Sequence, residues 1–478
     1  MPAEARLTRD GPAPAPGIVH LGPGAFFRAF NAVYTDEAMA AEGGAWGIRA
    51  ISLRSPDARD QLMPQGGVFS SVTLAPEGPQ VRVIGSVVDV LVAPEDPEAV
   101  VEAMSDPAIR IVSLTITEKG YCHEPATGTL RADHPDILHD LEGGAPRSAP
   151  GFIVEALARR RAAGTAPFTV LSCDNLPSNG RLARGVILDF ARRRDAALAD
   201  WIEAEVRFPG TMVDRITPAT TEADVDRLAE LKGWHDPACV QHEPFRQWVI
   251  EDEFPAGRPA WEVGGAQFVT SVDAHETMKL RCLNGTHSSL AYLGYLAGYE
   301  TIAETVGDAD FAGLCERLWG REILPTVPQP EGEDLPAYCA ALLERYRNPA
   351  IRHRTWQIAM DGSQKLPQRL LGTVRDNLAE GREVPGLALA VAAWMRYVGG
   401  TDESGAPIDV RDPLADRLKA LCDAKETPEG RVAALLGVRD VFDAELADNE
   451  AFATAVTAAY RGLEDFGARA MVQAYARG

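Results

Sequence analysis

The feature that most constrains the fold is a buried strand, a glycine turn and a helix, in that order, near the N-terminus. The apolar run Ile18–Leu21 ends in Gly22-Pro23-Gly24, and a helical pattern continues through about Met39. Two glycines at such a turn let the backbone approach a pyrophosphate, which the helix N-terminus favours electrostatically. The third glycine of the usual fingerprint is missing, since Phe27 stands there. The turn alone is weak evidence for dinucleotide binding, because any tight strand-to-helix turn could look the same.

The first half of the chain continues this alternation of strands and helices. Runs rich in Val, Ile and Leu with little polar alternation are typical of a parallel sheet buried on both faces. We therefore expect a Rossmann-like, doubly wound α/β domain over residues 18–272, after a short lead-in at 1–17. The candidate strands are 48–53, 81–84, 109–115 and 168–172, and the candidate helices are 148–163 and 185–200.

From about His275 onward the pattern becomes helical, with apolar residues three and four positions apart. Because 478 residues exceed what one hydrophobic core usually supports, a second domain is expected, mainly helical and spanning 273–478. Its candidate helices are 288–299, 311–318, 335–347, 387–397, 413–424 and 451–462.

The strongest chemical signal is an amine, an amide and an imidazole within one short segment. At about 100° per residue, Lys279 and His287 project about 80° apart and Asn284 within about 140° of both, so the three can face one cleft. A lysine with a lowered pKa can take a hydroxyl proton, while an amide stabilises the alkoxide and a histidine orients the substrate. The spacing alone leaves a plainer alternative open, a solvated lysine followed by an Asn-Gly loop.

Six ordered blocks give the chain a resemblance to the polyol-specific long-chain dehydrogenases, also called the mannitol dehydrogenase family. Three stretches, 117–122, 243–250 and 353–358, resemble the fructuronate reductase (D-mannonate oxidoreductase) branch. The blocks are Ile18–Ala29, Thr117-Glu-Lys-Gly-Tyr121, Ser172-Cys-Asp-Asn-Leu176, Val213-Asp-Arg-Ile216, Lys279–His287 and Asp361-Gly-Ser-Gln-Lys-Leu-Pro367.

The resemblance implies roles for residues in these blocks. Lys279 is expected to be the general acid/base, Asn175 and Asn284 an oxyanion pair, and His287 a substrate-orienting residue. Asn175, at a strand end, would meet the Lys279 segment in the cleft between the domains. The expected substrate-binding residues are Asp214, Lys365 and Lys119, and the expected cofactor-binding residues are Gly22, Gly24, Ala25, Phe26, Arg28, Arg54 and Asp57.

The cofactor choice depends on the residues directly after the second strand, where an acidic side chain would bind the adenosine ribose and select NAD. Here the sequence is Arg54-Ser55-Pro56-Asp57. Arg54 could meet a 2′-phosphate, or stack on adenine while Asp57 binds the ribose. The resemblance favours NAD, with NADP as the alternative. Seven cysteines without a Cys-x-x-Cys pair, and nine histidines without His-Glu-x-x-His, predict a metal-independent enzyme.

Composition limits the partners. A net charge of −22 argues against nucleic acid, and an anionic substrate would need local lysines and arginines against this field. No stretch approaches the roughly twenty apolar residues of a membrane span. Scattered cysteines suit a reducing cytoplasm, where we expect the protein to be located. The resemblance favours a monomer.

We therefore expect an NAD-dependent enzyme that interconverts D-mannonate and D-fructuronate. A dehydrogenase of mannitol, arabinitol or sorbitol is the alternative within the family. A dinucleotide-binding regulatory protein without catalytic activity is the alternative from another class, although the intact lysine, asparagines and histidine argue against it.

Overall fold

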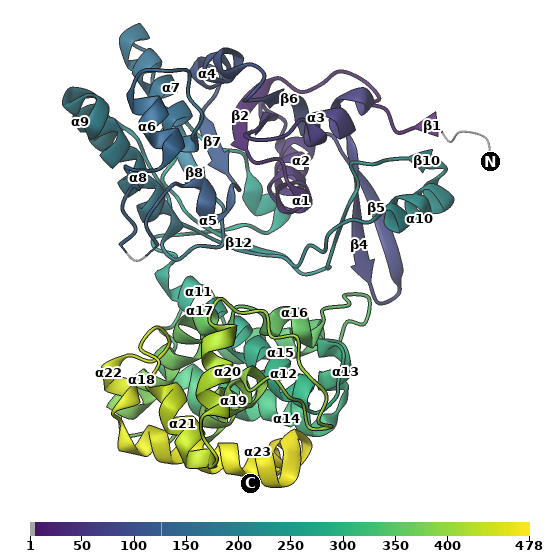
Figure 1. The fold of residues 1–478 in the computed structure, drawn as a ribbon. Helices are drawn as coiled ribbons and strands as arrows, with labels where there is room; N and C mark the ends of the chain where they lie inside the picture. Colours follow the sequence, from purple (N-terminus) through teal and green to yellow (C-terminus); the bar gives the residue numbers. More distant parts are fainter. Residues whose placement is uncertain (1–4, 126) are drawn as a thin grey trace. The chain divides into compact units, whose positions relative to one another are not determined.

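The computed structural model describes residues 5–125 and 127–478 and divides the chain into two compact units, 1–273 and 274–478 (Figure 1). The first unit contains all the strands, and the second is helical. The predicted domain boundary at residue 272 lies beside the observed division.

The first unit is built on a parallel five-stranded sheet in the order β6-β3-β2-β7-β8. Because every pair is parallel, the carboxyl ends of the strands share one edge of the sheet. This confirms the predicted doubly wound fold. The strands are β2 (Pro16–Leu21), β3 (Gly47–Ser52), β6 (Val87–Val92), β7 (Ile111–Leu114) and β8 (Thr169–Ser172).

Alternating side chains bury both faces of this sheet. Val19 and Leu21 pack on one face against helices α4 (Pro97–Ser105), α7 (Ala149–Ala163) and α8 (Asn179–Arg194). Ile18 packs on the other face, together with residues of α1 (Ala25–Ala29) and α2 (Asn31–Glu42). The continuous apolar runs in the sequence reflect this two-sided burial.

Two three-stranded sheets also belong to the unit. The hairpin β4 (Phe69–Ala75) and β5 (Gly78–Ile84) pairs with β11 (Val240–His242), and β12 (Gln247–Glu251) lies between β9 (Thr211–Asp214) and β13 (Gln267–Val269). The remaining α-helices of the unit are α3 (Asp57–Leu62), α5 (Thr117–Gly120), α6 (Pro135–Leu141), α9 (Ala196–Glu205) and α10 (Glu222–Lys232). The single helix predicted at 185–200 is thus two helices, α8 and α9, because Asp195 is extended and caps α9.

The described part of the lead-in is attached to the first unit. Strand β1 (Ala5–Arg6) pairs with β10 (Trp234–His235). The Arg9 guanidinium donates hydrogen bonds to the carbonyls of Gly66, Gly85 and Val87. Residues 1–4 lie outside the described residues.

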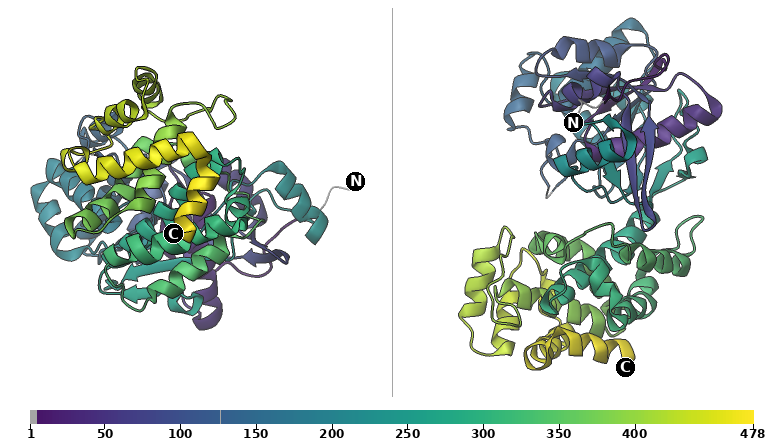
Figure 2. Two further views of the ribbon diagram at one scale, coloured as in Figure 1. Left: turned by 90° about the horizontal axis from the view of Figure 1, so that it is seen from below. Right: turned by 90° about the vertical axis from the view of Figure 1, so that its right-hand side faces the viewer.

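The second unit is organised around α19 (Pro385–Val398), which is apolar on nearly all sides and buried. It packs against α12 (Thr286–Leu296) and α23 (Glu450–Arg477), and α23 bends sharply at Gly467 (Figure 2). The other α-helices are α11 (Asp273–Met278), which leads into the unit, α13 (Ile302–Gly307), α14 (Ala309–Leu318), α15 (Leu335–Tyr346), α16 (Thr355–Ala359), α17 (Gly362–Leu366), α18 (Gly372–Ala379), α20 (Ala415–Asp423), α21 (Pro428–Leu436) and α22 (Ala444–Ala447).

Three segments of the second unit are π-helical: η3 (Lys279–Gly285), η4 (Trp319–Ile323) and η6 (Pro367–Leu371). Such segments are rare and frequently occur at functional sites. Two of them, η3 and η6, pack against each other.

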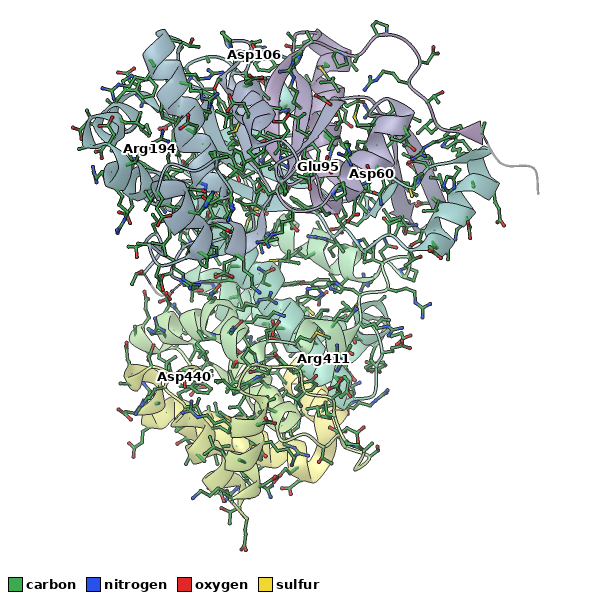
Figure 3. The ribbon with its side chains drawn as sticks, turned by 45° about the horizontal axis from the view of Figure 1, so that its top comes forward. Asp60, Glu95, Asp106, Arg194, Arg411 and Asp440 are labelled. Atoms are coloured by element: carbon green, nitrogen blue, oxygen red, sulfur yellow. The ribbon has the colours of Figure 1, made fainter. Side chains whose placement is uncertain are left out.

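Charged side chains cover the surface of both units (Figure 3). Those labelled in the figure form ion pairs, and several of these are exposed, such as Asp440 with Arg417 and Arg411 with Asp409. Exposed pairs of this kind contribute little to stability. Among residues 5–125 and 127–478, no helix combines the length and apolarity needed to span a bilayer.

Two buried histidines predict a specific pH dependence of stability. Burial lowers the pKa of His20 and of His242 to about 3. The unfolded chain binds protons at these side chains near pH 6.5 and the native chain does not, so native stability falls as the pH drops from about 6.5 towards 3. At about pH 5.5 each buried histidine should lower the free energy of unfolding by about 1.4 kcal/mol. Between about pH 7.5 and pH 5.5, the free energy of unfolding should fall by about 1.4 kcal/mol less in His242→Gln than in the wild type. Thermal unfolding at the two pH values measures this difference. Identical losses in the two proteins would contradict the burial of a neutral His242.

Candidate active site

A cavity of about 1080 Å³ lies at the carboxyl edge of the five-stranded sheet in the first unit. This is where parallel sheets bind nucleotides. Five of the predicted cofactor-binding residues line it, whereas Ala25 and Phe26 do not: the lining includes Gly22, Gly24, Arg28, Arg54 and Asp57. Phe27, which replaces the third glycine, is fully buried and stacks on His20 at a ring distance of 3.8 Å. It therefore belongs to the core and not to the cavity.

The glycine turn has a backbone that only glycine fits. Gly22 has a φ of 91°, and a Cβ there would lie 2.2 Å from the carbonyl oxygen of Thr115. Its N–H donates to Ile51 O at 3.0 Å, which ties the turn to β3. A Cβ on Gly24 would meet no atom within 4 Å, so the turn presents bare backbone at this position. The turn thus has the close-approach surface that a pyrophosphate requires.

Charges suited to the two parts of a dinucleotide line the same cavity. The Arg28 guanidinium donates to Ala238 O at 2.8 Å, and burial lowers its pKa. Beyond β3, Ser55 Oγ donates to Asp57 Oδ2 at 2.8 Å and so fixes the carboxylate at the start of α3. A cation suits the pyrophosphate, and an oriented carboxylate suits the ribose hydroxyls.

Asp174 fixes the loops that follow β7 and β8. Its carboxylate accepts the backbone N–H groups of Ile116 and Thr117 at 3.0 and 2.9 Å, and the Tyr121 hydroxyl at 2.7 Å. Burial raises the pKa of Asp174, and these hydrogen bonds act against that shift. They hold Thr117 at a φ of 63°, which is unfavourable for a β-branched residue. Neither Asp174 nor Tyr121 had a predicted role, although both lie in blocks that carry the family resemblance.

The predicted substrate residues of the first unit occupy separate positions. Asn175 lies three residues after the last residue of β8, at the carboxyl edge of the sheet. Lys119 is exposed and lines the same cavity as Gly22. Asp214 ends β9, pairs with Gln247 of β12 and is 6% exposed. The meeting of Asn175 with the Lys279 segment stays a prediction.

In the second unit, Lys279 begins the π-helix η3, and Asn284 lies near its end. The side-chain angles predicted from the sequence assume α-helical geometry and are therefore wrong, because a π-helix winds more slowly. Lys279 is 8% exposed. A Cβ on Gly285 would lie 2.7 Å from Arg369 O, so the glycine allows η3 to approach η6 closely.

His287, in the first turn of α12, lies among aromatic rings and cations. Its ring centroid lies 5.3 Å from that of Tyr346, in a stacked arrangement, and 4.6 Å from that of His353. Burial, followed by the positive charges nearby, holds the pKa of His287 well below its usual range. His287 is therefore a neutral ring that can donate or accept a hydrogen bond. Among the described residues, no hydrogen bond occupies either ring nitrogen of His287 or the Asn284 amide.

Lys365 lies near His287 and His353, because its positive charge helps to lower the pKa of both histidines. We call these three residues and Arg369 the cation cluster. Its Nζ donates to Met360 O at 2.5 Å and approaches Ile358 O at 3.4 Å. Burial, and then Arg369, lower its pKa. Arg369, Tyr346 and His353 had no role predicted from the sequence. The available signal was the position of His353 in the stretch 353–358 and of Arg369 just after the block that ends at Pro367.

The described residues contain no group of three or more His, Cys, Asp or Glu side chains placed to hold a metal ion.

The glycine turn generates a test. We expect Gly22→Ala to weaken NADH affinity at least about tenfold, because the new Cβ must displace the turn at a strain of order 1–3 kcal/mol. Gly185→Ala is the matched control, since a Cβ at this exposed position of α8 meets no atom within 4 Å. Titration of both variants with NADH checks the prediction, and equal affinities would exclude the turn from the binding site.

Comparisons with known proteins agree with this geometry. Residues 16–263 match the family model of the mannitol dehydrogenase Rossmann domain, and residues 271–464 match that of the mannitol dehydrogenase C-terminal domain. D-mannonate oxidoreductase of Escherichia coli (strain K12) is 49% identical over 96% of this chain and 95% of its own length. Mannitol 2-dehydrogenase of Cereibacter sphaeroides is 42% identical over 98% of each chain.

A solved structure gives the same result. Pseudomonas fluorescens mannitol 2-dehydrogenase, in a ternary complex with NAD and D-mannitol, is 40% identical and superposes with a TM-score of 0.83 over 99% of this chain and 97% of that chain. The fold, the cavity and these matches agree, and the chain belongs to the mannitol dehydrogenase family of oxidoreductases.

Proposed function

We propose that this protein is an NAD-dependent oxidoreductase that interconverts D-mannonate and D-fructuronate. The observation that carries the proposal is the positive charge around His287. Arg369, Arg345 and Lys365 all act on this histidine. The identity to D-mannonate oxidoreductase supports the same substrate pair.

This local charge is opposite in sign to that of the whole chain, which carries −22. Asp361 and Asp412 act on Lys365 with the opposite sign, but the charges that act on His287 all lower its pKa, as positive charges do. A neutral polyol can accept hydrogen bonds from these cations, whereas a sugar acid also gains the attraction between opposite charges. The cluster therefore favours a carboxylate-bearing substrate.

The cofactor is NAD, which when bound supplies the hydride acceptor for alcohol oxidation and the donor for ketone reduction. The first unit fits it through the Gly22–Gly24 turn, Arg28 and the Asp57 carboxylate. A carboxylate at the ribose disfavours the 2′-phosphate of NADP.

The proton chemistry belongs to the chain's own residues. Lys279 Nζ takes the hydroxyl proton of D-mannonate and returns it to the ketone oxygen of D-fructuronate in the reverse direction. Asn284 and Asn175 donate hydrogen bonds to the developing alkoxide, and the neutral His287 orients the same end of the substrate.

The substrate assignment is tested by NADH oxidation with D-fructuronate and D-fructose side by side, repeated with NADPH. We expect a kcat/KM for D-fructuronate at least about 100-fold above that for D-fructose, because one buried charge-assisted pair is worth several kcal/mol. Equal or better turnover of D-fructose would assign the protein to the polyol dehydrogenases. No turnover of either ketose would favour a regulatory dinucleotide-binding protein.

The role of Lys279 gives a second prediction. We expect Lys279→Ala to lower kcat by at least about 100-fold, the usual contribution of general acid–base catalysis, with little change in NADH affinity. Lys425→Ala is the control, since this exposed lysine lies in the same unit. Steady-state kinetics and NADH titration separate the two effects. Substantial turnover by Lys279→Ala at neutral pH would place the base elsewhere.

A further inference from the structure

Arg369 is a half-buried arginine on η6 that no acidic side chain neutralises among the described residues. Its Nη1 donates to Ser288 Oγ at 3.1 Å, and this is its one hydrogen bond within that part of the chain. Burial lowers its pKa. No carboxylate among residues 5–125 and 127–478 forms an ion pair with it. A buried cation without a partner costs stability, so it calls for a functional explanation.

The side chains around Arg369 increase the loss of stability that comes from burying its charge. Its charge acts on His287, His353 and Lys365, which are neutral or positive. Burial and the adjacent cations lower the pKa of His353 to about 4, so this ring is neutral near pH 7 and does not offset the charge of Arg369. A negative ligand group would relieve the repulsion among these side chains.

The position of Arg369 is fixed relative to the segment Lys279–His287, which carries the proposed catalytic residues. Its backbone carbonyl lies against Gly285, where a Cβ would come within 2.7 Å of it. Its guanidinium bonds to Ser288, which directly follows His287. With only Nη1 engaged, the remaining donors of the planar guanidinium can bind a carboxylate in a bidentate manner.

The two lysines among the expected substrate-binding residues are less suited to hold the substrate carboxylate. Lys365 Nζ already donates to Met360 O at 2.5 Å and lies 3.4 Å from Ile358 O. Lys119 lies in the cavity that holds the glycine turn, in the other unit. Lysine is also a point charge without the bidentate geometry of arginine.

We infer that Arg369 binds the carboxylate of the substrate and so selects ketouronates over uncharged ketoses. This inference rests on the proposed function for the reaction itself, and it adds the residue that recognises the acid. The carboxylate and the reacting ketone lie towards opposite ends of D-fructuronate. Binding of the acid by Arg369 therefore determines which end of the sugar reaches Lys279.

The test compares the wild type with Arg369→Met, Arg369→Lys and the control Arg417→Met, which removes an exposed arginine paired with Asp440. The substrates are D-fructuronate, its epimer D-tagaturonate, and D-fructose, each with NADH. We expect Arg369→Met to lower the ratio of kcat/KM for D-fructuronate to that for D-fructose about 100-fold, mainly through KM for the acid. Arg369→Lys keeps the positive charge but not the bidentate donor geometry of the guanidinium, so it should lower the ratio about tenfold. Arg417→Met should not change it.

The outcomes separate this inference from the proposed function. If the wild type prefers D-fructuronate and Arg369→Met keeps the same ratio, the function stands and the inference is overturned. If the wild type prefers D-tagaturonate and the variant loses that preference, the substrate pair is wrong and the inference stands. Reduction of D-fructose alone by the wild type overturns both.

Thermal unfolding distinguishes recognition from a structural role. Removing a cation that lacks an acidic neighbour should leave the unfolding temperature of Arg369→Met unchanged or higher. A marked decrease, together with equal losses of kcat/KM for the acid and the ketose, would identify Arg369 as a structural residue. If Arg369→Met does not fold, the ratio of kcat/KM values measured with Arg369→Lys still tests the inference.

Discussion

The chemistry of the second unit depends on the close packing of two π-helices at Gly285. Because a Cβ there would lie 2.7 Å from Arg369 O, only glycine lets η3 and η6 approach this closely. One of these segments begins at Lys279 and the other carries Arg369. A single backbone contact thus sets the position of the segment that begins at Lys279, the proposed acid/base, relative to Arg369.

The first unit follows a similar principle, in which backbone geometry, and not a dense set of side chains, shapes the binding surface. The Gly22 turn is held by β3 on one side and limited by Thr115 O on the other. The Asp174 carboxylate fixes the neighbouring loop, including the unfavourable φ of Thr117. Strain and buried charge of this kind lower stability, and they persist where a precise binding geometry requires them.

The fold could be predicted well from the sequence, and the details of the site less well. Apolar runs and the turn at Gly22 indicated the parallel sheet, because a sheet buried on both faces leaves a clear apolar pattern. The π-helix at Lys279–Gly285 leaves no such signal, since its residues also suit an α-helix. Arg369 was missed because its significance comes from the lack of an acidic neighbour among the described residues, which depends on the tertiary structure. The split between α8 and α9 at Asp195 was missed because a capping aspartate inside a helical pattern is a weak signal.

The most direct measurement is a crystal structure of the protein with NAD and D-mannonate. We predict that the carboxylate lies within hydrogen-bonding distance of the Arg369 guanidinium, and that the hydroxyl to be oxidised contacts Lys279 Nζ and the Asn284 amide. A carboxylate held by Lys119, or exposed to solvent with Lys279 remote from the reacting hydroxyl, would contradict both the proposed chemistry and the role of Arg369.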